Sequence, residues 1–173
     1  FWINSKFFGV LAERNSVGFI QPPTQSDAGL ERTLITGQFQ NIGNETRVVK
    51  RYKFYKKKNG VFIAGLRAYK GWAQTGQGAA DTSSDANFNY TNDDKPENSK
   101  YTFPSKNLAT FFEHSFFLNN KWSITPGGRF ELINTSTDGY FNRYLIGLNG
   151  DTLNISRSEN SSTKNRSLFL TGL

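Results

Sequence analysis

The segment Ser123–Thr135, with the sequence SITPGGRFELINT, decides the fold class because its side chains alternate between two kinds of surface. One face carries apolar or small residues, namely Ile124, Pro126, Gly128, Phe130 and Leu132. The other face carries Thr125, Arg129 and Glu131. A period of two residues indicates a β-strand. A strand that is apolar on one side and charged on the other separates two media.

Three other segments repeat this alternation less regularly. Val61–Trp72 has Phe62, Ala64, Leu66 and Ala68 on one face and Gly65, Arg67 and Tyr69 on the other. Leu108–Leu118 has Leu108, Phe112, Phe116 and Leu118 on one face, together with Thr110 and His114. Glu45–Tyr55 has Glu45, Arg47, Arg51 and Lys53 on one face, and Lys50 on the opposite, more apolar face. The pattern predicts an all-β chain of roughly six or seven strands.

The connections between these segments fall into two length classes. Short turns are expected at Lys57–Gly60, which ends in Asn-Gly, and at Leu118–Lys121. Long polar loops are expected at Val17–Thr33, Gln74–Ser105 and Thr135–Arg166, and a small hairpin, Tyr144–Ile155, is expected to project from the last of these around Asn149-Gly150. Short turns alternating with long loops, on strands of about 9–11 residues, are typical of a bacterial outer-membrane β-barrel. Trp122 beside a short turn and Trp72 beside a long loop would then mark the two membrane interfaces.

Composition agrees with such a barrel and excludes several other classes. The chain has 173 residues, a formal net charge of +7, no cysteine and one histidine. Disulfide scaffolds, cysteine zinc sites, thiol catalysis and histidine-rich metal sites are therefore excluded. Hydrophobic residues make up 36% of the chain and aromatic residues 15%, which suits strands with one face toward a polar lumen. Because the chain opens on Phe1 and holds no methionine, we expect it to be a piece of a longer protein.

Several stretches resemble the barrel of TonB-dependent outer-membrane receptors of the ferric dicitrate type. They are Glu13–Phe19 (ERNSVGF), Gly43–Arg47 (GNETR), Gly65–Gly71 (GLRAYKG), Gln77-Gly78, Asp85–Phe88 (DANF), Asn107–His114 (NLATFFEH) and Ser123–Glu131 (SITPGGRFE). The Thr-Pro-Gly-x-Arg-x-Glu run is common to many such receptors and identifies the superfamily better than the ligand, and the longer set points to the ferric dicitrate branch. His114 stands where the family pattern leads us to expect Asn, and residues 140–165 match no part of it.

The resemblance implies that residues 1–173 form part of an antiparallel transmembrane barrel of about 22 strands with long extracellular loops. It implies active uptake of a ferric chelate, such as ferric dicitrate or another siderophore-like complex, across the outer membrane of a Gram-negative bacterium. The partners would be outer-membrane lipid, the chelate, and the TonB complex, which acts through a plug domain that this chain lacks. No cofactor bound by the fragment, no nucleic-acid partner and no enzymatic activity are expected.

Candidate site residues follow from this barrel interpretation. Six charged residues would face the lumen as a polar network: Glu45, Arg47, Arg67, Glu113, Arg129 and Glu131. Such a network is primarily a set of ion pairs lining the wall, and it is also a path for a hydrated anionic ligand. Three arginines assigned to loops, Arg14, Arg143 and Arg157, are candidates for contact with an anionic chelate, since guanidinium binds carboxylate in bidentate fashion.

Other patterns favour ordinary structural roles. Asp81, Asp85, Asp93 and Asp94 fit no calcium loop, so a solvated loop is preferred and no metal site is predicted. The basic run from Lys50 to Lys58, interleaved with aromatic residues, is interpreted as a solvated strand end and turn rather than a nucleic-acid site. His114 lacks a convergent nucleophile and carboxylate, so a surface histidine is expected.

The same alternation of apolar and polar residues also permits one alternative fold. In a soluble all-β carbohydrate-binding or adhesin-like module, the alternation would mark a core face and a solvent face. That module would leave Arg67, Glu113, Arg129 and Glu131 in solvent and would pack its apolar faces together. The feature that discriminates the two interpretations is therefore the inward-facing charge, together with the tryptophans at strand ends, which a soluble module would not need.

Overall fold

The computed structural model describes residues 1–19, 24, 29–54, 58–91 and 98–172 of the chain. The described residues contain strands and no helix, which confirms the all-β prediction. The strands are β1 (Trp2–Gly18), β2 (Arg32–Phe54), β3 (Lys58–Ala80), β4 (Ser99–Phe117), β5 (Ser123–Ile124), β6 (Gly127–Ile146) and β7 (Thr152–Gly172). Accordingly, the described part of the chain has no helix long and apolar enough to cross a bilayer.

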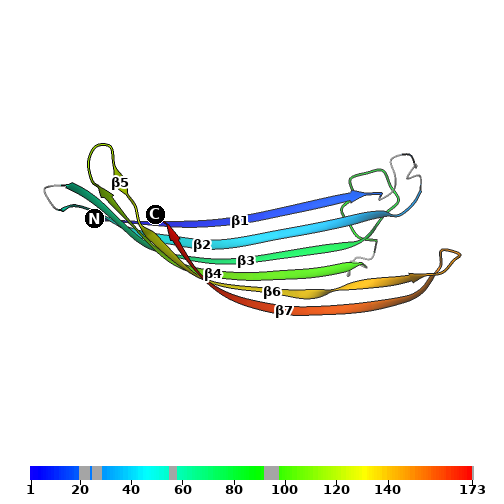
Figure 1. Cartoon of the computed structure of the whole chain (residues 1–173). Helices are drawn as coiled ribbons and strands as arrows, with labels where there is room; N and C mark the ends of the chain where they lie inside the picture. Colours follow the sequence, from blue (N-terminus) through cyan, green and yellow to red (C-terminus); the bar gives the residue numbers. More distant parts are fainter. Residues whose placement is uncertain (20–23, 25–28, 55–57, 92–97, 173) are drawn as a thin grey trace.

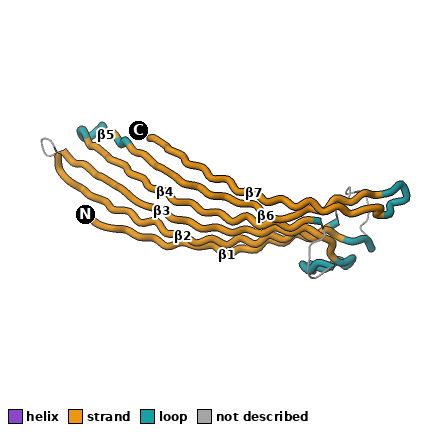
Figure 2. Tube along the Cα trace, turned by 90° about the horizontal axis from the view of Figure 1, so that it is seen from below, coloured by secondary structure: helices purple, strands orange, loops and turns teal. Residues whose placement is uncertain are grey.

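The strands form one antiparallel sheet that follows the order of the chain. The order is β1-β2-β3-β4-β6-β7, and the two-residue β5 pairs with β4. Figures 1 and 2 show a long, curved sheet with both termini at the end that carries β5. The sheet is open, because β1 and β7 lie at its two edges and no pairing between them is found in the described ranges. It forms a single curved layer with two free edges.

The connections agree in part with the prediction. The turn after β4 lies at residues 118–122, and the β6–β7 hairpin turns at residues 147–151, where Gly150 has a φ of 85°. The β1–β2 and β3–β4 connections lie at the opposite end from β5, as Figure 1 shows. The short turn predicted at Lys57–Gly60 is displaced toward the N-terminus, because Phe54 already pairs with Lys58, and Asn59 and Gly60 lie within β3. Lys56, Lys57 and Pro22-Pro23 lie outside the described residues.

The strands are much longer than predicted, with 17–23 residues in each of the six main strands. The predicted loop Thr135–Arg166 is wrong, because most of it forms the outer halves of β6 and β7. The loop predicted at Gln74–Ser105 likewise shrinks, since β3 runs to Ala80 and β4 begins at Ser99. Trp72 therefore lies inside β3 rather than at its end.

Polar pairs explain why the middle of β6 and β7 is strand without an apolar stripe. Asn134 Nδ2 donates to Asn165 Oδ1 over 2.7 Å, and the Ser136 and Thr163 hydroxyls are 2.9 Å apart. Both pairs join residues that are directly opposite across β6 and β7. Main-chain ladders and polar cross-strand contacts hold such strands, so alternation of apolar residues is not required.

The sheet has two chemically different faces over its central part. Cα partners in antiparallel strands share a face. We call one the apolar face, defined by Phe7, Val48, Phe62, Leu66, Leu108, Phe112, Phe130, Leu132 and Phe169. We call the other the charged face, defined by Glu45, Arg47, Arg67, Glu113, Arg129 and Glu131.

The apolar face is the more exposed of the two. Leu66 is 51% exposed, Leu132 47% and Phe130 40%. On the charged face of the same strands, Arg67, Arg129 and Glu131 are half-buried. The fully buried apolar residues are few; Leu34 and Ala109 are at 0% exposure. This arrangement reverses the usual one, in which apolar side chains leave water and charges remain in it.

Candidate functional site

The charged face brings the six predicted charged residues together. Glu45 lies opposite Arg67 across β2 and β3, and both share one row with Glu131 of β6 through the intervening Ala109. Arg47 and Arg129 lie in the next row, separated by Gly65 and Phe111. Glu113 lies one row further toward β5, opposite Gly127. The placement on one face is therefore as predicted.

Ion pairs and one amide connect four of these residues to their neighbours. Arg67 Nη1 lies 3.7 Å from Glu45 Oε2 across the strands. Arg129 pairs with Glu131 along β6. Asn107 Nδ2 of β4 donates to Glu131 Oε2 over 3.1 Å. Arg47 and Glu113 lie on the same face but form no ion pair or side-chain hydrogen bond with any described residue.

Each of the two paired arginines covers an aromatic ring that itself covers a glycine. The Phe8 ring lies over Gly43, and the Arg67 guanidinium lies 5.0 Å from the centre of that ring. The Phe111 ring lies over Gly65, and the Arg129 guanidinium lies 5.9 Å from its centre. A Cβ on Gly65 would lie 2.8 Å from the Thr46 carbonyl oxygen and would overlap the ring. Glycine thus lets the rings lie flat on the sheet, and the guanidinium groups gain cation–π contacts.

The three arginines expected in loops do not lie in loops. Arg14 belongs to β1, Arg143 to β6 and Arg157 to β7, because these strands extend further than the apolar pattern indicated. Arg143 and Arg157 instead contact rings of β6: they lie 5.2 Å from the Phe141 centre and 4.0 Å from the Tyr140 centre. Arg157 Nε also donates to Asn142 Oδ1 over 3.3 Å. The structure does not gather the three arginines into one site.

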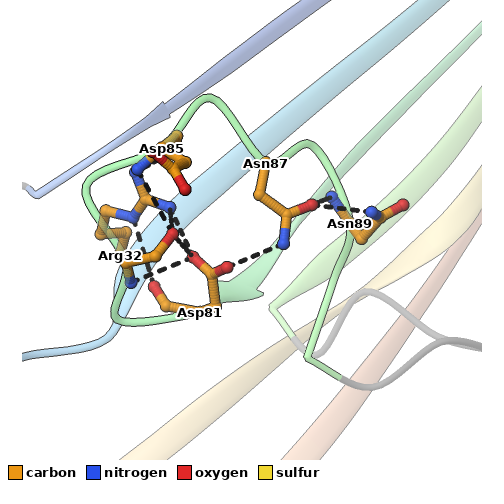
Figure 3. Close-up of polar contacts among 6 residues, drawn as sticks. Arg32, Asp81, Asp85, Asn87 and Asn89 are labelled. Atoms are coloured by element: carbon orange, nitrogen blue, oxygen red, sulfur yellow. Dashed lines mark hydrogen bonds and ion pairs between the residues drawn. The ribbon is translucent and has the colours of Figure 1, made fainter.

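Sequence reasoning missed the best-connected polar cluster, which centres on Arg32 (Figure 3). Arg32 is 7% exposed, and it donates to the Asp85 carbonyl over 2.8 Å, to Ser83 Oγ over 3.0 Å and to the Asp81 carboxylate. Asn87 Nδ2 donates to the other Asp81 oxygen over 2.7 Å. The hydrogen bonds from Arg32, Asn87 and Ser83 lower the pKa of Asp81 to about 2. No local sequence motif predicts this cluster, because Arg32 and Asp81 come together only through the β2–β3 pairing.

The same cluster fixes the connection that follows β3. Tyr90 bridges back to Ala80, and its hydroxyl lies 2.8 Å from Thr36 Oγ1 of β2. Burial is the main cause that raises the pKa of Tyr90. Asp81 and Asp85 are therefore part of a structural clasp, while Asp93 and Asp94 lie outside the described residues. Among the described side chains, no three His, Cys, Asp or Glu residues gather to hold a metal ion.

His114 is part of an aromatic cluster near the β5 end of the apolar face. Its Nε2 contacts the Tyr52 hydroxyl, and its ring centre lies 3.9 Å from that of Phe116. Phe54 meets Phe116 edge-on at 5.8 Å, and Phe62 meets His114 at 5.7 Å. Lys50 lies in the row of Phe62 and His114, on the side that its sequence position indicated. The cluster places polar-tipped rings at the edge of the apolar residues, an arrangement common at membrane interfaces.

Comparison with known proteins adds no family assignment: no family model, no curated protein and no solved structure matches this chain.

Proposed function

We propose that this sheet is a section of the wall of an outer-membrane barrel belonging to a TonB-dependent transporter for a ferric chelate. In this proposal the apolar face contacts lipid and the charged face lines the lumen. Strands elsewhere in the complete gene product close the barrel beyond β1 and β7, because lipid does not tolerate unpaired strand edges. The chain performs no bond chemistry, and its wall guides a solute past the plug domain.

The greater exposure of the apolar face is the observation that carries the proposal. In water, this sheet would be destabilised in two ways. Leu66, Phe112 and Leu132 would expose apolar surface, and Arg67 and Glu131 would be partly desolvated. In a bilayer the same arrangement is favourable, since hydrocarbon covers the apolar side and lumen water solvates the ion pairs. Meander topology with β5 and both termini at one end also suits a barrel.

The charge balance of the charged face supports an anionic cargo. Over the four rows from Val49 to Gly43 of β2, the cations outnumber the carboxylates. The cations are Lys6, Arg47, Arg67, Arg129 and Arg166, and the carboxylates are Glu45, Glu113 and Glu131. A surface with a positive excess raises the local concentration of an anion such as a ferric dicitrate complex.

Fluorescence quenching by lipid tests which medium covers the apolar face. The chain has no cysteine, so Leu66→Cys and Leu168→Cys each give one labelling position in this chain. Leu66 lies on the apolar face and Leu168 on the charged face, opposite Glu131, and the two are similarly exposed, at 51% and 42%. The label is an environment-sensitive fluorophore, attached before the complete protein is folded into vesicles with nitroxide-labelled lipids. We expect quenching at position 66 and little at position 168.

The quenching experiment also decides against the soluble alternative. A carbohydrate-binding or adhesin-like module would pack its apolar face against another protein layer, so lipid nitroxides would quench neither position. Equal quenching at both positions would also contradict the lumen assignment.

The cargo requires a separate measurement. Uptake of radioactive iron supplied with citrate is compared between wild type and R67Q/R129Q in cells without another citrate receptor. We expect slower uptake by the variant, with the larger difference at low ionic strength, because screening weakens an electrostatic path. Uptake by the variant at the wild-type rate at every ionic strength would show that the charged face does not interact with the cargo.

A further inference from the structure

Two lysines interrupt the apolar face toward the end opposite β5. Lys70 of β3 and Lys106 of β4 are Cα partners, so their side chains leave the sheet directly side by side. Both are exposed, and neither ammonium forms an ion pair or hydrogen bond with the described part of the chain. Like charges directly opposite each other destabilise an antiparallel pair. An anion bound between the two ammonium groups would remove this repulsion.

The sheet itself places no compensating carboxylate beside the pair. The row of the lysines continues through Ile42 on one side and Asn134 on the other. The closest carboxylates of this face along their strands are Glu13 and Asp138, the latter four residues beyond Asn134. Four residues span about 13 Å along a strand. That distance exceeds the screening length of about 8 Å at physiological ionic strength.

An apolar groove adjoins the two ammonium groups. It has a volume of about 820 Å³ and is lined by both lysines and by Phe7, Ile42, Leu108 and Leu132. The groove lies on the apolar face and crosses the strands from β1 toward β7. An occupant that satisfies both parts of this surface has an anionic head and a hydrocarbon body.

We infer that Lys70 and Lys106 together bind the phosphate headgroup of an anionic membrane lipid, with its acyl chains along the groove. The inference rests on the proposed function, because it needs the apolar face to be in a bilayer. Phosphate oxygens accept hydrogen bonds from both ammonium groups and remove their mutual repulsion. Free inorganic phosphate would use the lysines alone and leave the groove without a role.

Lys50 provides a matched control on the same face. It lies near the β5 end, in a row with Phe62 and His114, so it has no lysine opposite it on β3. A single interfacial lysine contacts headgroups without forming a site for one of them. The variant K50Q therefore removes one positive charge from the same face and leaves the paired site intact.

The test uses the complete protein in nanodiscs of phosphatidylcholine, alone or mixed with phosphatidic acid, and counts the lipids retained after detergent extraction by native mass spectrometry. We expect wild type to retain phosphatidic acid selectively. Each lysine near an anionic headgroup contributes about fivefold, so K70Q/K106Q is expected to bind phosphatidic acid about 25-fold more weakly. K50Q and the charge-preserving K70R/K106R are expected to retain the selectivity.

Retention of phosphatidic acid by K70Q/K106Q at the wild-type level would overturn the inference. Displacement of the lipid by equimolar inorganic phosphate would overturn it as well, because the groove would then add nothing. Failure of the proposed function has a different signature, namely absence of lipid quenching at position 66. A protein that is quenched there but shows no lysine-dependent selectivity would refute the lipid site alone.

Discussion

Arg67 faces Glu45 across β2 and β3, with Nη1 3.7 Å from Oε2, and its guanidinium also lies 5.0 Å from the centre of the Phe8 ring. One side chain thus joins three neighbouring strands on the charged face. The ring and the carboxylate hold the guanidinium near the sheet, and its side chain remains 41% exposed.

The Glu45–Arg67 ion pair is expected to contribute little to stability. Partly exposed pairs of this kind contribute about 0–1 kcal/mol, since water screens both charges. A double-mutant cycle with E45Q and R67Q, measured by urea unfolding in vesicles, should therefore give a coupling below about 1 kcal/mol. A coupling of several kcal/mol would mean that the charged face is far drier than this geometry indicates.

Gly65→Ala should disturb the Phe111 ring that lies over it. The added Cβ would overlap the ring and lie 2.8 Å from the Thr46 carbonyl oxygen, and the resulting strain should cost about 1–3 kcal/mol of unfolding free energy. Gly18→Ala is the matched control, because a Cβ there meets no atom within 4 Å. Equal stability of the two variants would show that Phe111 does not lie over Gly65.

A charge placed on the apolar face should be costly only if lipid covers it. Leu66→Arg is expected to destabilise the protein in vesicles by about 2–4 kcal/mol, the cost of arginine near the bilayer midplane. Leu168→Arg, which places the same charge on the charged face opposite Glu131, should be nearly neutral. Similar unfolding free energies for both variants would contradict the assignment of the two faces.

The Arg32–Asp81 clasp should open only in strong acid. The folded pKa of Asp81, about 2, is below its ordinary value of 3.8. Its contribution is therefore fully present above about pH 4 and is lost as the pH falls toward 2. Pepsin cleavage near Phe88 should increase over this interval in wild type. In D81N the cleavage should already be high at pH 4 and should change less between pH 4 and 2.

The chain of 173 residues on its own should not insert into a bilayer. Its strands β1 and β7 leave unpaired backbone groups at both sheet edges, which hydrocarbon cannot satisfy. Electrophoresis of unheated and heated samples in detergent should show no folded, heat-sensitive band. Such a band would mean that the edges pair with each other or with another copy.

The sequence predicted the parts of the fold where one face is apolar. The alternation around Phe130 and Leu66 identified the strands, and it placed all six charged residues of the network on one face. It placed the hairpin turn at Asn149-Gly150 but failed for the strands on either side within residues 135–166, because polar pairs such as Ser136–Thr163 leave no periodic signal. The Arg32–Asp81 cluster could not be predicted from the sequence either, because 49 positions separate its members and only the strand register brings them together.

The middle of the β6–β7 hairpin, residues 134–138 and 161–165, is polar on both sides of the sheet and is held by its main chain and by polar cross-strand pairs. Its shape therefore depends weakly on which side chains it carries, provided that the residues favour extended backbone. Substitutions there that keep a preference for extended backbone should therefore cost little stability, so this stretch can change the chemistry of its surface while the sheet stays the same.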